Sequence, residues 1–279
     1  MGAVRELVAG LCDDAALFPP GDAELRLALR DHADHRRGPR AELLGPFVIP
    51  AARIDEVAAA ATAPVDVSVT VPGGPAEAGA ALTRLQAMPH LTVRAVEVAL
   101  PEGLPVTAGL CGAVAALEAP RVYLEVPRDD RRAAVLDGIA GGVFAKLRTG
   151  GPTARAHPDS RELADVLTRL VAAGIGFKAT AGLHRAIRHR DRATGFEQHG
   201  FLNVMLAVHR ARCGDSAAEL AEVLEERDGA RIVEALCGLD RSQITLLRSS
   251  FHSFGTCSIA EPIADLVRLG LIAESSVSR

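Results

Sequence analysis

Short apolar runs rich in valine and other β-branched residues alternate with alanine-rich helical patterns along most of the chain. Eight such runs are typical of strands, and they lie at 11–17, 47–50, 65–71, 92–100, 121–126, 142–148, 175–180 and 250–257. The clearest helical patterns lie at 51–62, 75–88, 106–118, 128–139, 158–173 and 259–271. Strands that alternate with helices pair in parallel, and at 279 residues a closed barrel fits this alternation best. The sequence therefore predicts an α/β fold, a single (β/α)8 TIM barrel.

The alternative fold is an open, doubly wound parallel sheet. No GxGxxG segment follows the first predicted strand, so the common nucleotide-binding version of that sheet is not indicated. Hydrophobic residues make up 48% of the chain but aromatic residues only 3%, so the core must be built from Ala, Val, Leu and Ile. No stretch resembles a linker or a low-complexity segment, and we expect residues 1–279 to form one domain.

One region breaks the alternation of strands and helices. Between His184 and Asp240 the distance to the next predicted strand is much longer than elsewhere, and helical patterns fill it at 200–212, 217–227 and 230–237. We expect an elaborated connection after the seventh strand, with a helical insertion at about 184–240. Because it follows the carboxyl end of a strand, it should lie at the active-site face of the barrel. The basic stretch at 185–192 could grip an anionic substrate or form a solvated loop.

Charge and cysteine content exclude several classes of protein. The net charge is −4 and the isoelectric point about 6.1, so the chain lacks the electrostatic footprint of a nucleic-acid-binding protein. The five cysteines are odd in number and form no CxxC pair, which does not favour a disulfide framework. No secretion signal and no apolar stretch of membrane-spanning length is apparent. We expect a cytoplasmic protein without membrane or nucleic-acid partners, while homo-oligomerisation stays open.

Lysine occurs only twice, at Lys146 and Lys178, against twenty-nine arginines. Arginine stays charged at any accessible pH, whereas a lysine that is desolvated or placed beside another cation can lose its proton and attack a carbonyl. Each lysine follows a short apolar run and precedes a glycine-containing exit, which is typical of the end of a strand. On neighbouring barrel strands the two would lie roughly 5 Å apart in backbone spacing, and one pKa should fall. We predict that this pair is catalytic.

Carboxylates are expected at the same end of the barrel, because the carboxyl ends of all eight strands open into one shared pocket. The candidates are Asp13 and Asp14 on the first strand, Glu97 on the fourth and Glu125 on the fifth. A free amine there could form a Schiff base with an aldehyde or ketone, and Glu97 could move protons through water. The structural alternative is a buried salt-bridge network, in which the lysines pair with Glu97 and Glu125 without any catalysis.

The histidines give a competing signal. His184, His189 and His199 are close in sequence, and Cys257 could lie nearby; all four are metal-ligand types. Their spacing matches no HExxH motif, so we expect no metal here and regard these histidines as surface or substrate-contacting residues. A metal-dependent hydrolase that uses the three histidines remains the alternative function. Cys257 could also be a nucleophile, but a small buried apolar role is the simpler interpretation.

Residues 146–150, 156–160 and 176–182 together resemble segments of the class I aldolases of the deoxyribose-phosphate aldolase group. Residues 146–150 (Lys-Leu-Arg-Thr-Gly) and 156–160 (Ala-His-Pro-Asp-Ser) are similar to the family's segment that holds the Schiff-base lysine. Residues 176–182 (Gly-Phe-Lys-Ala-Thr-Ala-Gly) are similar to the segment carrying the second lysine, which lowers the pKa of the first. The resemblance thus implies that Lys146 forms the imine and that Lys178 lowers the pKa of Lys146.

Three further segments extend the resemblance along nearly the whole barrel. Residues 95–101 are similar to the family's strand whose Asp shuttles protons, 11–17 to its first strand with an active-site Asp, and 254–258 to its closing strand. By this resemblance Glu97 and Asp13 relay protons. The chain is also similar to a broad set of bacterial proteins with Phe-Pro-Pro, Phe-Lys-Ala-Thr-Ala-Gly-Leu-His and His-Gly-Phe-Leu-Asn segments, from which no function follows.

The chain departs from the aldolase pattern at several positions. Glu97 replaces Asp, Gly151 stands where the aldolases have a phosphate-contacting lysine, and His184 stands where they usually have arginine. The insertion at 184–240 has no counterpart there. Gly182 and Gly255 remain, and their backbone N–H groups could cradle a phosphate. Carbonyl chemistry therefore carries over better than phosphate recognition.

The prediction is a Schiff-base lyase, an aldolase acting on a small aldehyde or ketone, phosphorylated or not. No cofactor is required, because the imine itself is the electron sink. The substrate-binding residues expected around the catalytic four are Glu125, Arg148, Thr149, Gly150, Gly182, His184, Gly255, Cys257 and Ser258. A non-catalytic barrel that binds a carbonyl metabolite is the remaining alternative.

Overall fold

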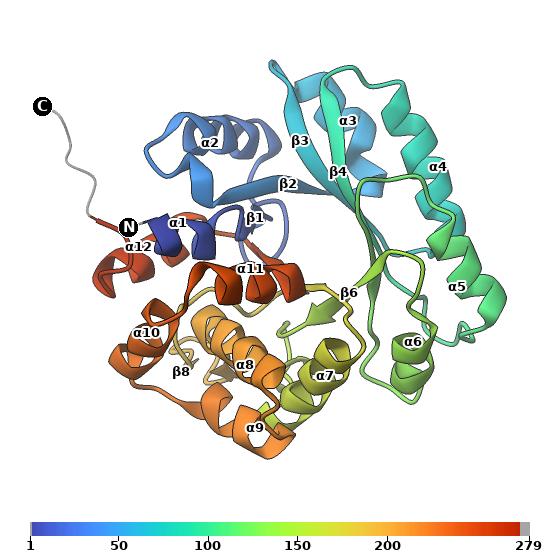
Figure 1. The fold of residues 1–279 in the computed structure, drawn as a ribbon. Coiled ribbons are helices and arrows are strands. Elements are labelled where there is room, and N and C mark those ends of the chain that lie inside the picture. Colours follow the sequence, from blue (N-terminus) through green and yellow to red (C-terminus); the bar gives the residue numbers. More distant parts are fainter. Residues whose placement is uncertain (1, 274–279) are drawn as a thin grey trace, which may run out of the picture.

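Eight parallel strands close into a barrel in the computed structural model, which describes residues 2–273 (Figure 1). The order around the barrel is β1-β10-β7-β6-β5-β4-β3-β2, so the first and last barrel strands are neighbours. The strands are β1 (Cys12–Asp14), β2 (Leu44–Pro50), β3 (Val65–Val71), β4 (Leu91–Val98), β5 (Val122–Glu125), β6 (Val143–Arg148), β7 (Phe177–Thr180) and β10 (Phe251–Thr256).

Side chains alternate between the inside of the barrel and the helices around it. In β3, for example, Val67, Val69 and Val71 are fully buried, whereas Ser68 between them reaches a carboxylate inside the barrel. Successive residues of a strand point to opposite faces, so every second residue points into the barrel. Lys146 pairs with Lys178 in the β6–β7 register, so the two lysines share the inner face. The apolar residues therefore pack against helices, and the polar residues gather on the barrel axis.

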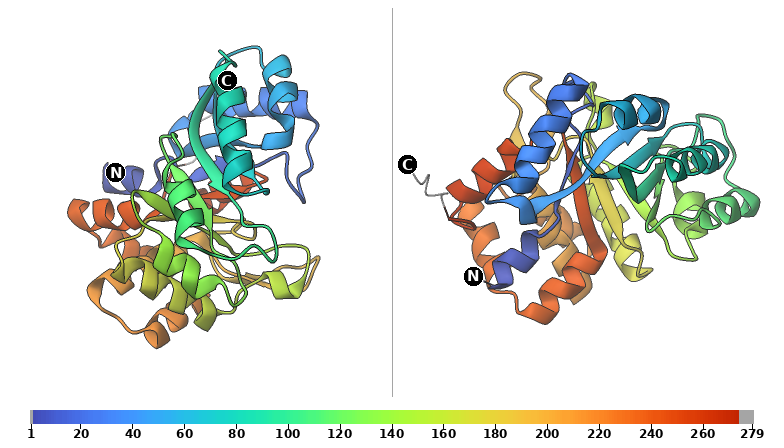
Figure 2. Two further views of the ribbon diagram at one scale, coloured as in Figure 1. Left: turned by 90° about the vertical axis from the view of Figure 1, so that its right-hand side faces the viewer. Right: turned by 90° about the horizontal axis from the view of Figure 1, so that it is seen from above.

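Helices surround the outer face of this sheet (Figures 1 and 2). They are α1 (Gly2–Val8), α2 (Leu25–Arg37), α3 (Ile54–Ala60), α4 (Pro75–Gln86), α5 (Ala108–Ala115), α6 (Arg132–Gly138), α7 (Ser160–Ala172) and α12 (Ala260–Arg268), with short 3-10 turns at Ala41–Leu43, Ala51–Arg53 and Ala154–Ala156. Helix α7 illustrates their construction, because Asp159 caps its N-terminus and Leu163, Leu167 and Leu170 form a buried stripe.

A long connection joins β7 to β10. It contains a small antiparallel hairpin of β8 (His189–Arg190) and β9 (Glu197–Gln198), then α8 (Phe201–Cys213), α9 (Ala217–Glu225), α10 (Gly229–Cys237) and α11 (Arg241–Ser250). Helix α8 is buried from Phe201 to Val208, because α7, α9, α10 and α11 pack around it. The insertion is thus an integral part of the helical layer.

The predicted barrel is confirmed, and each of the eight predicted strands overlaps an observed one. The helices at 200–212, 217–227 and 230–237 are also present, within a few residues of their predicted ends. Three helices were not predicted: α1, α2 and α11. The stripe of α2 shows why, since its buried residues Leu25, Ala28 and Leu29 are completed by a histidine, His32, where an apolar residue would be expected. Among the described residues, no helix combines the length and the apolar character needed to cross a membrane.

Candidate active site

Lys178 is the most deeply enclosed charged group on the barrel axis. It extends from β7, is 1% exposed, and its Nζ donates hydrogen bonds to Asp13 Oδ2 at 2.6 Å and Glu97 Oε1 at 2.5 Å. Asp13 comes from β1 and Glu97 from β4, so this ammonium group ties together strands on opposite sides of the barrel. One buried cation is thereby matched by two buried carboxylates.

Glu97 joins the two lysines. Its Oε1 accepts from Lys178, while its Oε2 lies 3.1 Å from Lys146 Nζ on β6. Lys146 Nζ is also 3.1 Å from Glu125 Oε2 on β5, and Arg148 Nε donates to the other oxygen of Glu125 at 3.2 Å. A continuous chain of alternating charges therefore runs from Asp13 to Arg148 across the carboxyl ends of five strands.

The pKa shifts follow from burial and from these ion pairs. Burial alone would lower the pKa of Lys178, but Asp13 and Glu97 outweigh it and raise that pKa above its ordinary value. Burial alone would raise the pKa of Glu97, yet the two flanking lysines hold it well below its usual range. The pKa of Asp13 is raised, because burial outweighs its contacts with Lys178. For Glu125, Lys146 and Arg148 overcome the effect of burial and lower the pKa.

These contacts correct one part of the sequence prediction. The two ammonium groups were expected to face each other, so that one would lose its proton; instead a carboxylate of Glu97 lies between them. Lys178 is held as a cation by its own two carboxylates. The salt-bridge network that was the structural alternative is present. A free amine at Lys146 thus requires transfer of its proton to a neighbouring carboxylate, and both Glu97 and Glu125 are within reach.

Three residues of the cluster were missed from the sequence. Ser68 Oγ donates to Glu97 Oε1 at 2.6 Å, and Ser253 Oγ donates to Asp13 Oδ2 at 2.8 Å. Tyr123 lies beneath them, with the Lys178 Nζ 5.6 Å from its ring centre. For Ser68 the available signal was the period of two, since it lies between the buried Val67 and Val69. Ser253 follows His252, so the same alternation did not reveal it.

Asp14 was expected in the same pocket, and this prediction is wrong. The next residue along a strand points to the opposite face, so Asp14 turns away from the barrel axis. Its Oδ2 lies 2.9 Å from His32 Nδ1, and both side chains are buried between β1 and α2. Asp14 is therefore a link between the sheet and a covering helix.

Thr149, Gly150 and Gly182 join the loops that leave β6 and β7. Thr149 is buried, and its hydroxyl donates to the carbonyl groups of Thr180 and Ala181. A methyl group on Gly150 would stand 2.8 Å from Gly182 Cα, and Gly182 has a φ of +79°. These glycines are required because the two loop backbones touch, and that packing accounts for them without a bound anion.

His184, Cys257 and Ser258 lie together at the rim where β10 ends. His184 Nδ1 lies 3.2 Å from Glu261 Oε2 and 3.7 Å from Cys257 Sγ, and Ser258 N–H donates to Thr256 Oγ1 at 3.3 Å. Burial raises the pKa of the Cys257 thiol, which opposes a nucleophilic role. The predicted rim residues are therefore present on one side of the barrel mouth.

Gly255 sits on the inner wall below this rim. It pairs in register with Asp13 and with Thr180, and a methyl group there would meet nothing closer than 3.6 Å. Gly255 therefore leaves room beside the charged cluster, as the substrate-binding role expected of it requires.

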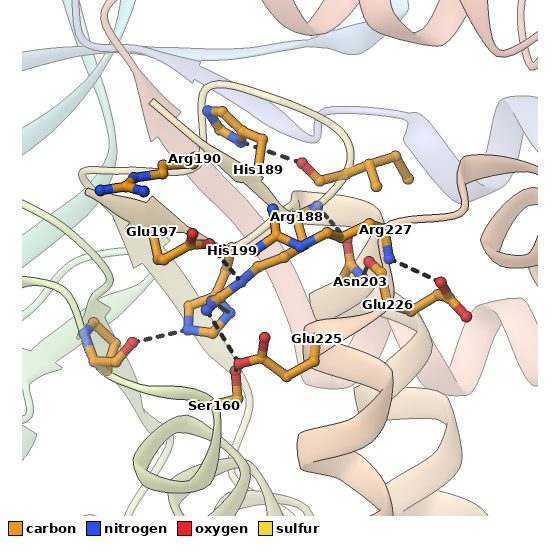
Figure 3. Close-up of polar contacts among 12 residues, drawn as sticks. Ser160, Arg188, His189, Arg190, Glu197, His199, Asn203, Glu225, Glu226 and Arg227 are labelled. Atoms are coloured by element: carbon orange, nitrogen blue, oxygen red, sulfur yellow. Dashed lines mark hydrogen bonds and ion pairs between the residues drawn. The ribbon is translucent and has the colours of Figure 1, made fainter. Parts of the chain in front are cut away.

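The three histidines of the alternative metal site have separate partners. His184 faces Glu261, His189 Nδ1 lies 3.2 Å from the Ile187 carbonyl, and His199 lies between Arg188 and the Pro158 carbonyl (Figure 3). In residues 2–273, no three His, Cys, Asp or Glu side chains are grouped as metal ligands. The geometry therefore gives no support to a site built from these three histidines.

The basic stretch at 185–192 does not act as one surface. Arg188 is 8% exposed; its guanidinium contacts His199 Nδ1 at 3.0 Å and Glu225 Oε1 at 3.1 Å (Figure 3). Arg185 pairs with Asp265 at 3.0 Å, and Arg190 bonds within its own hairpin. Arg188 thus fastens the hairpin to α9, and His199 fastens it to the segment before α7. Arg188 itself is therefore neither a substrate grip nor part of a solvated loop.

An open pocket of about 280 Å³ lies at the outer end of the chain of charges, where Glu125 and Arg148 line it and Lys146 does not. Glu125 and Arg148 form its inner wall, and Arg128, Thr153 and Arg155 form the outer wall. Glu125 belongs both to this wall and to the chain of charges, so a ligand in the pocket would be one carboxylate away from Lys146 Nζ. The arrangement combines a buried amine, two neighbouring carboxylates and an open pocket that reaches one of them, Glu125.

Neither a scan against models of protein families nor a search of curated proteins found a match for this chain.

Proposed function

We propose that the protein is a Schiff-base lyase in which Lys146 forms an imine with a small aldehyde or ketone. The observation that carries this proposal is the position of Lys146: its Nζ lies 3.1 Å from each of two carboxylates, and one of these, Glu125, lines an open pocket. The resemblance of residues 146–150 and 176–182 to class I aldolases supports the same role. Lys178, enclosed by Asp13 and Glu97, serves as a fixed cation rather than as the nucleophile.

The reaction follows from ordinary imine chemistry. The Lys146 ammonium transfers a proton to a carboxylate, the neutral amine attacks the carbonyl carbon, and the carbonyl oxygen leaves as water. The resulting iminium withdraws an electron pair from the adjacent C–H or C–C bond, which gives an enamine and releases a proton or an aldehyde. In this proposal Glu97 and Asp13, which both accept hydrogen bonds from Lys178, relay that proton through water.

The network also explains why a structural role and a catalytic role are compatible. Buried ion pairs bring little net stability, because desolvation of the charges offsets their attraction. Six charged groups along one end of the barrel axis thus stabilise the fold little, so stability alone does not account for them. The same charges fix the position of Lys146 and supply its proton acceptors, which is what imine formation requires.

Deuterium exchange tests this function without knowledge of the second substrate. Formation of the enamine replaces the hydrogens next to the carbonyl with deuterium in D2O, and proton NMR of acetaldehyde, acetone, pyruvate and dihydroxyacetone follows their loss. We expect exchange of at least one compound with the wild-type chain and only the background rate with Lys146→Arg. Arg161→Lys is the matched control, since it adds an exposed lysine and should exchange like the wild type. If no compound exchanges, or if Lys146→Arg exchanges fully, the function is wrong.

A further inference from the structure

The pocket that Glu125 lines is also lined by three arginines, two of which use only part of their hydrogen-bonding capacity. Arg128 is committed, because its guanidinium binds both oxygens of Glu162, at 2.8 Å and 2.6 Å. Arg148 uses only Nε, toward Glu125. Within residues 2–273, the Arg155 guanidinium makes no hydrogen bond or ion pair. Two guanidinium groups therefore face the pocket with donors to spare.

The charge around the pocket is positive. Arg128 and its neighbour Arg132 share the single carboxylate of Glu162, and Glu125 is shared between Arg148 and Lys146. Arg155 adds a further cation without a matching carboxylate. Guanidinium groups bind carboxylate and phosphate through paired hydrogen bonds, and these charge-assisted bonds are among the strongest in proteins. An oxyanion is thus the ligand that this lining favours.

Glu125 connects the pocket to Lys146, because it lines the pocket and pairs with the lysine. A single carboxylate, that of Glu125, separates the Arg148 Nε from the Lys146 Nζ, at 3.2 Å and 3.1 Å respectively. A substrate whose anionic group is bound by Arg148 could therefore reach Lys146 with its carbonyl carbon only if a short carbon chain separated the two groups. Gly182, one of the two glycines expected to cradle a phosphate, instead packs against the backbone of Thr149 and Gly150.

We propose that Arg148 and Arg155 bind the anionic group of a short carbonyl substrate, a carboxylate or a phosphate, and that this frees Glu125 to accept the proton of Lys146. This rests on the proposed function. In the free protein Arg148 holds Glu125 Oε1. When the substrate anion takes Arg148, Glu125 keeps only Lys146 as its charged partner. Glu125 then accepts one ammonium proton and returns it to the departing oxygen, which leaves as water.

Glu125 has a feature that suits this exchange. Its buried Oε2 faces Lys146 but forms no well-aligned hydrogen bond with any described residue. This oxygen therefore lies close to the amine and has acceptor capacity that no aligned hydrogen bond uses. Loss of the Arg148 contact also removes one of the two charges that hold the pKa of Glu125 low, which makes the carboxylate a better base.

Matched pairs of compounds test the substrate class. Acetone and pyruvate differ by a carboxylate, and dihydroxyacetone and dihydroxyacetone phosphate differ by a phosphate. We expect Arg155→Gln to raise the concentration of the anionic compound that gives half-maximal deuterium exchange roughly tenfold or more. The corresponding concentration of the neutral compound should not change. The pair with the larger change identifies the anion. Arg161→Gln, an exposed arginine outside the pocket, should change neither value. Equal effects on both members of both pairs overturn the proposal.

A second measurement keeps this test independent of imine formation. Phenylglyoxal modifies accessible arginines, and peptide mass spectrometry resolves the sites. Inorganic phosphate or pyruvate should slow modification of Arg148 and Arg155 but not of Arg161, even in Lys146→Arg, which cannot form the imine. Protection without deuterium exchange would leave the anion site standing and the lyase wrong. Exchange without protection would leave the lyase standing and the anion site wrong.

Discussion

At the scale of single residues, Glu97 is the position on which the cluster depends. It is 1% exposed, and its two oxygens separate Lys178 from Lys146. Removal of one partner from a buried ion pair leaves an uncompensated charge, which costs far more than the pair contributes as a whole. The contribution of the Glu97 side chain to the free energy of unfolding can therefore be measured independently of any activity.

Glu97→Gln should lower the free energy of unfolding by about 3–5 kcal/mol, because both lysines then lie buried without their shared carboxylate. Urea denaturation followed by circular dichroism measures the change. Glu56→Gln is the matched control, since Glu56 is exposed and pairs only with Arg53, and it should have little effect. A Glu97→Gln protein as stable as the wild type would mean that the cluster is not closed in solution.

His199 is a second residue with a measurable consequence. Burial, and then the neighbouring Arg188, lower the pKa of His199 to about 4, from about 6.5 in an unfolded chain. Between these values the unfolded state binds the proton more readily than the folded state. The contribution of the neutral His199 to the free energy of unfolding is therefore fully present above about pH 6.5 and is lost as the pH falls toward 4.

Replacement of this histidine should flatten the pH profile. For His199→Gln, the decrease in unfolding free energy between pH 7 and pH 4 should be smaller than in the wild type by up to about 3 kcal/mol. Glutamine can still accept from Arg188 and donate to the Pro158 carbonyl, so stability at pH 7 should change little. Urea titrations at several pH values provide the measurement, and parallel profiles for the two proteins would rule out a buried neutral His199.

At the scale of elements, the connection from β7 to β10 is held by contacts that no periodicity reveals. Asn203 in α8 is fully buried; it accepts from the Arg188 N–H at 2.9 Å and donates to the Val223 and Glu226 carbonyls at 2.9 and 2.7 Å. One side chain thus fixes the hairpin and the end of α9 onto α8 (Figure 3). The sequence predicted the helices of this insertion, but not that an asparagine and a buried arginine would fasten them.

Gly200 and Gly79 test how tightly two elements are packed. A methyl group on Gly200, before α8, would stand 2.3 Å from the Ala186 carbonyl oxygen and 2.4 Å from Ile187 Cα, whereas one on Gly79 in α4 would meet nothing within 4 Å. Gly200→Ala should destabilise by about 2–4 kcal/mol through forced backbone movement. Gly79→Ala should stabilise by about 0.5–1 kcal/mol, because alanine is the better helix former. Thermal unfolding compares the two, and equal shifts would contradict the packing described for α8.

The elements differ in how readily the sequence predicted them. The parallel strands were identifiable because valine recurs at every second position in runs such as Val65–Val71, which is the period of a strand. Helix α2 was missed because charged residues dominate it and His32 completes its buried stripe. The cluster of Asp13, Glu97, Lys146 and Lys178 followed from the geometry of a barrel. Asp14 was misplaced, since the direction of a side chain depends on a strand register that one sequence does not give.

At the scale of the whole molecule, the barrel and its insertion share one core. Helix α8 packs against α7, α9 and α11, and Phe201 stacks on Phe254 of the last barrel strand, with ring centres 4.9 Å apart. An insertion whose apolar face is buried against the barrel should not unfold by itself. The chain is therefore expected to be one cooperative unit, as its lack of a linker predicts.

The single tyrosine makes this cooperativity measurable. Tyr123 lies inside the barrel and the chain has no tryptophan, so its fluorescence reports on the barrel alone, whereas far-ultraviolet circular dichroism reports on all helices. The two urea unfolding curves should coincide in midpoint and slope. An earlier transition in circular dichroism, before any change in Tyr123 fluorescence, would show that α8–α11 unfold independently of the barrel.

The central claim is that Lys146 is the amine that binds a carbonyl compound, and reductive trapping tests it most directly. Incubation with pyruvate, dihydroxyacetone or acetaldehyde in the presence of cyanoborohydride converts an imine into a stable secondary amine, which peptide mass spectrometry locates. We predict one added mass on the peptide that contains Lys146, and its absence in Lys146→Arg. An adduct on Lys178 instead, or no adduct on either lysine with any of the three compounds, would contradict the account.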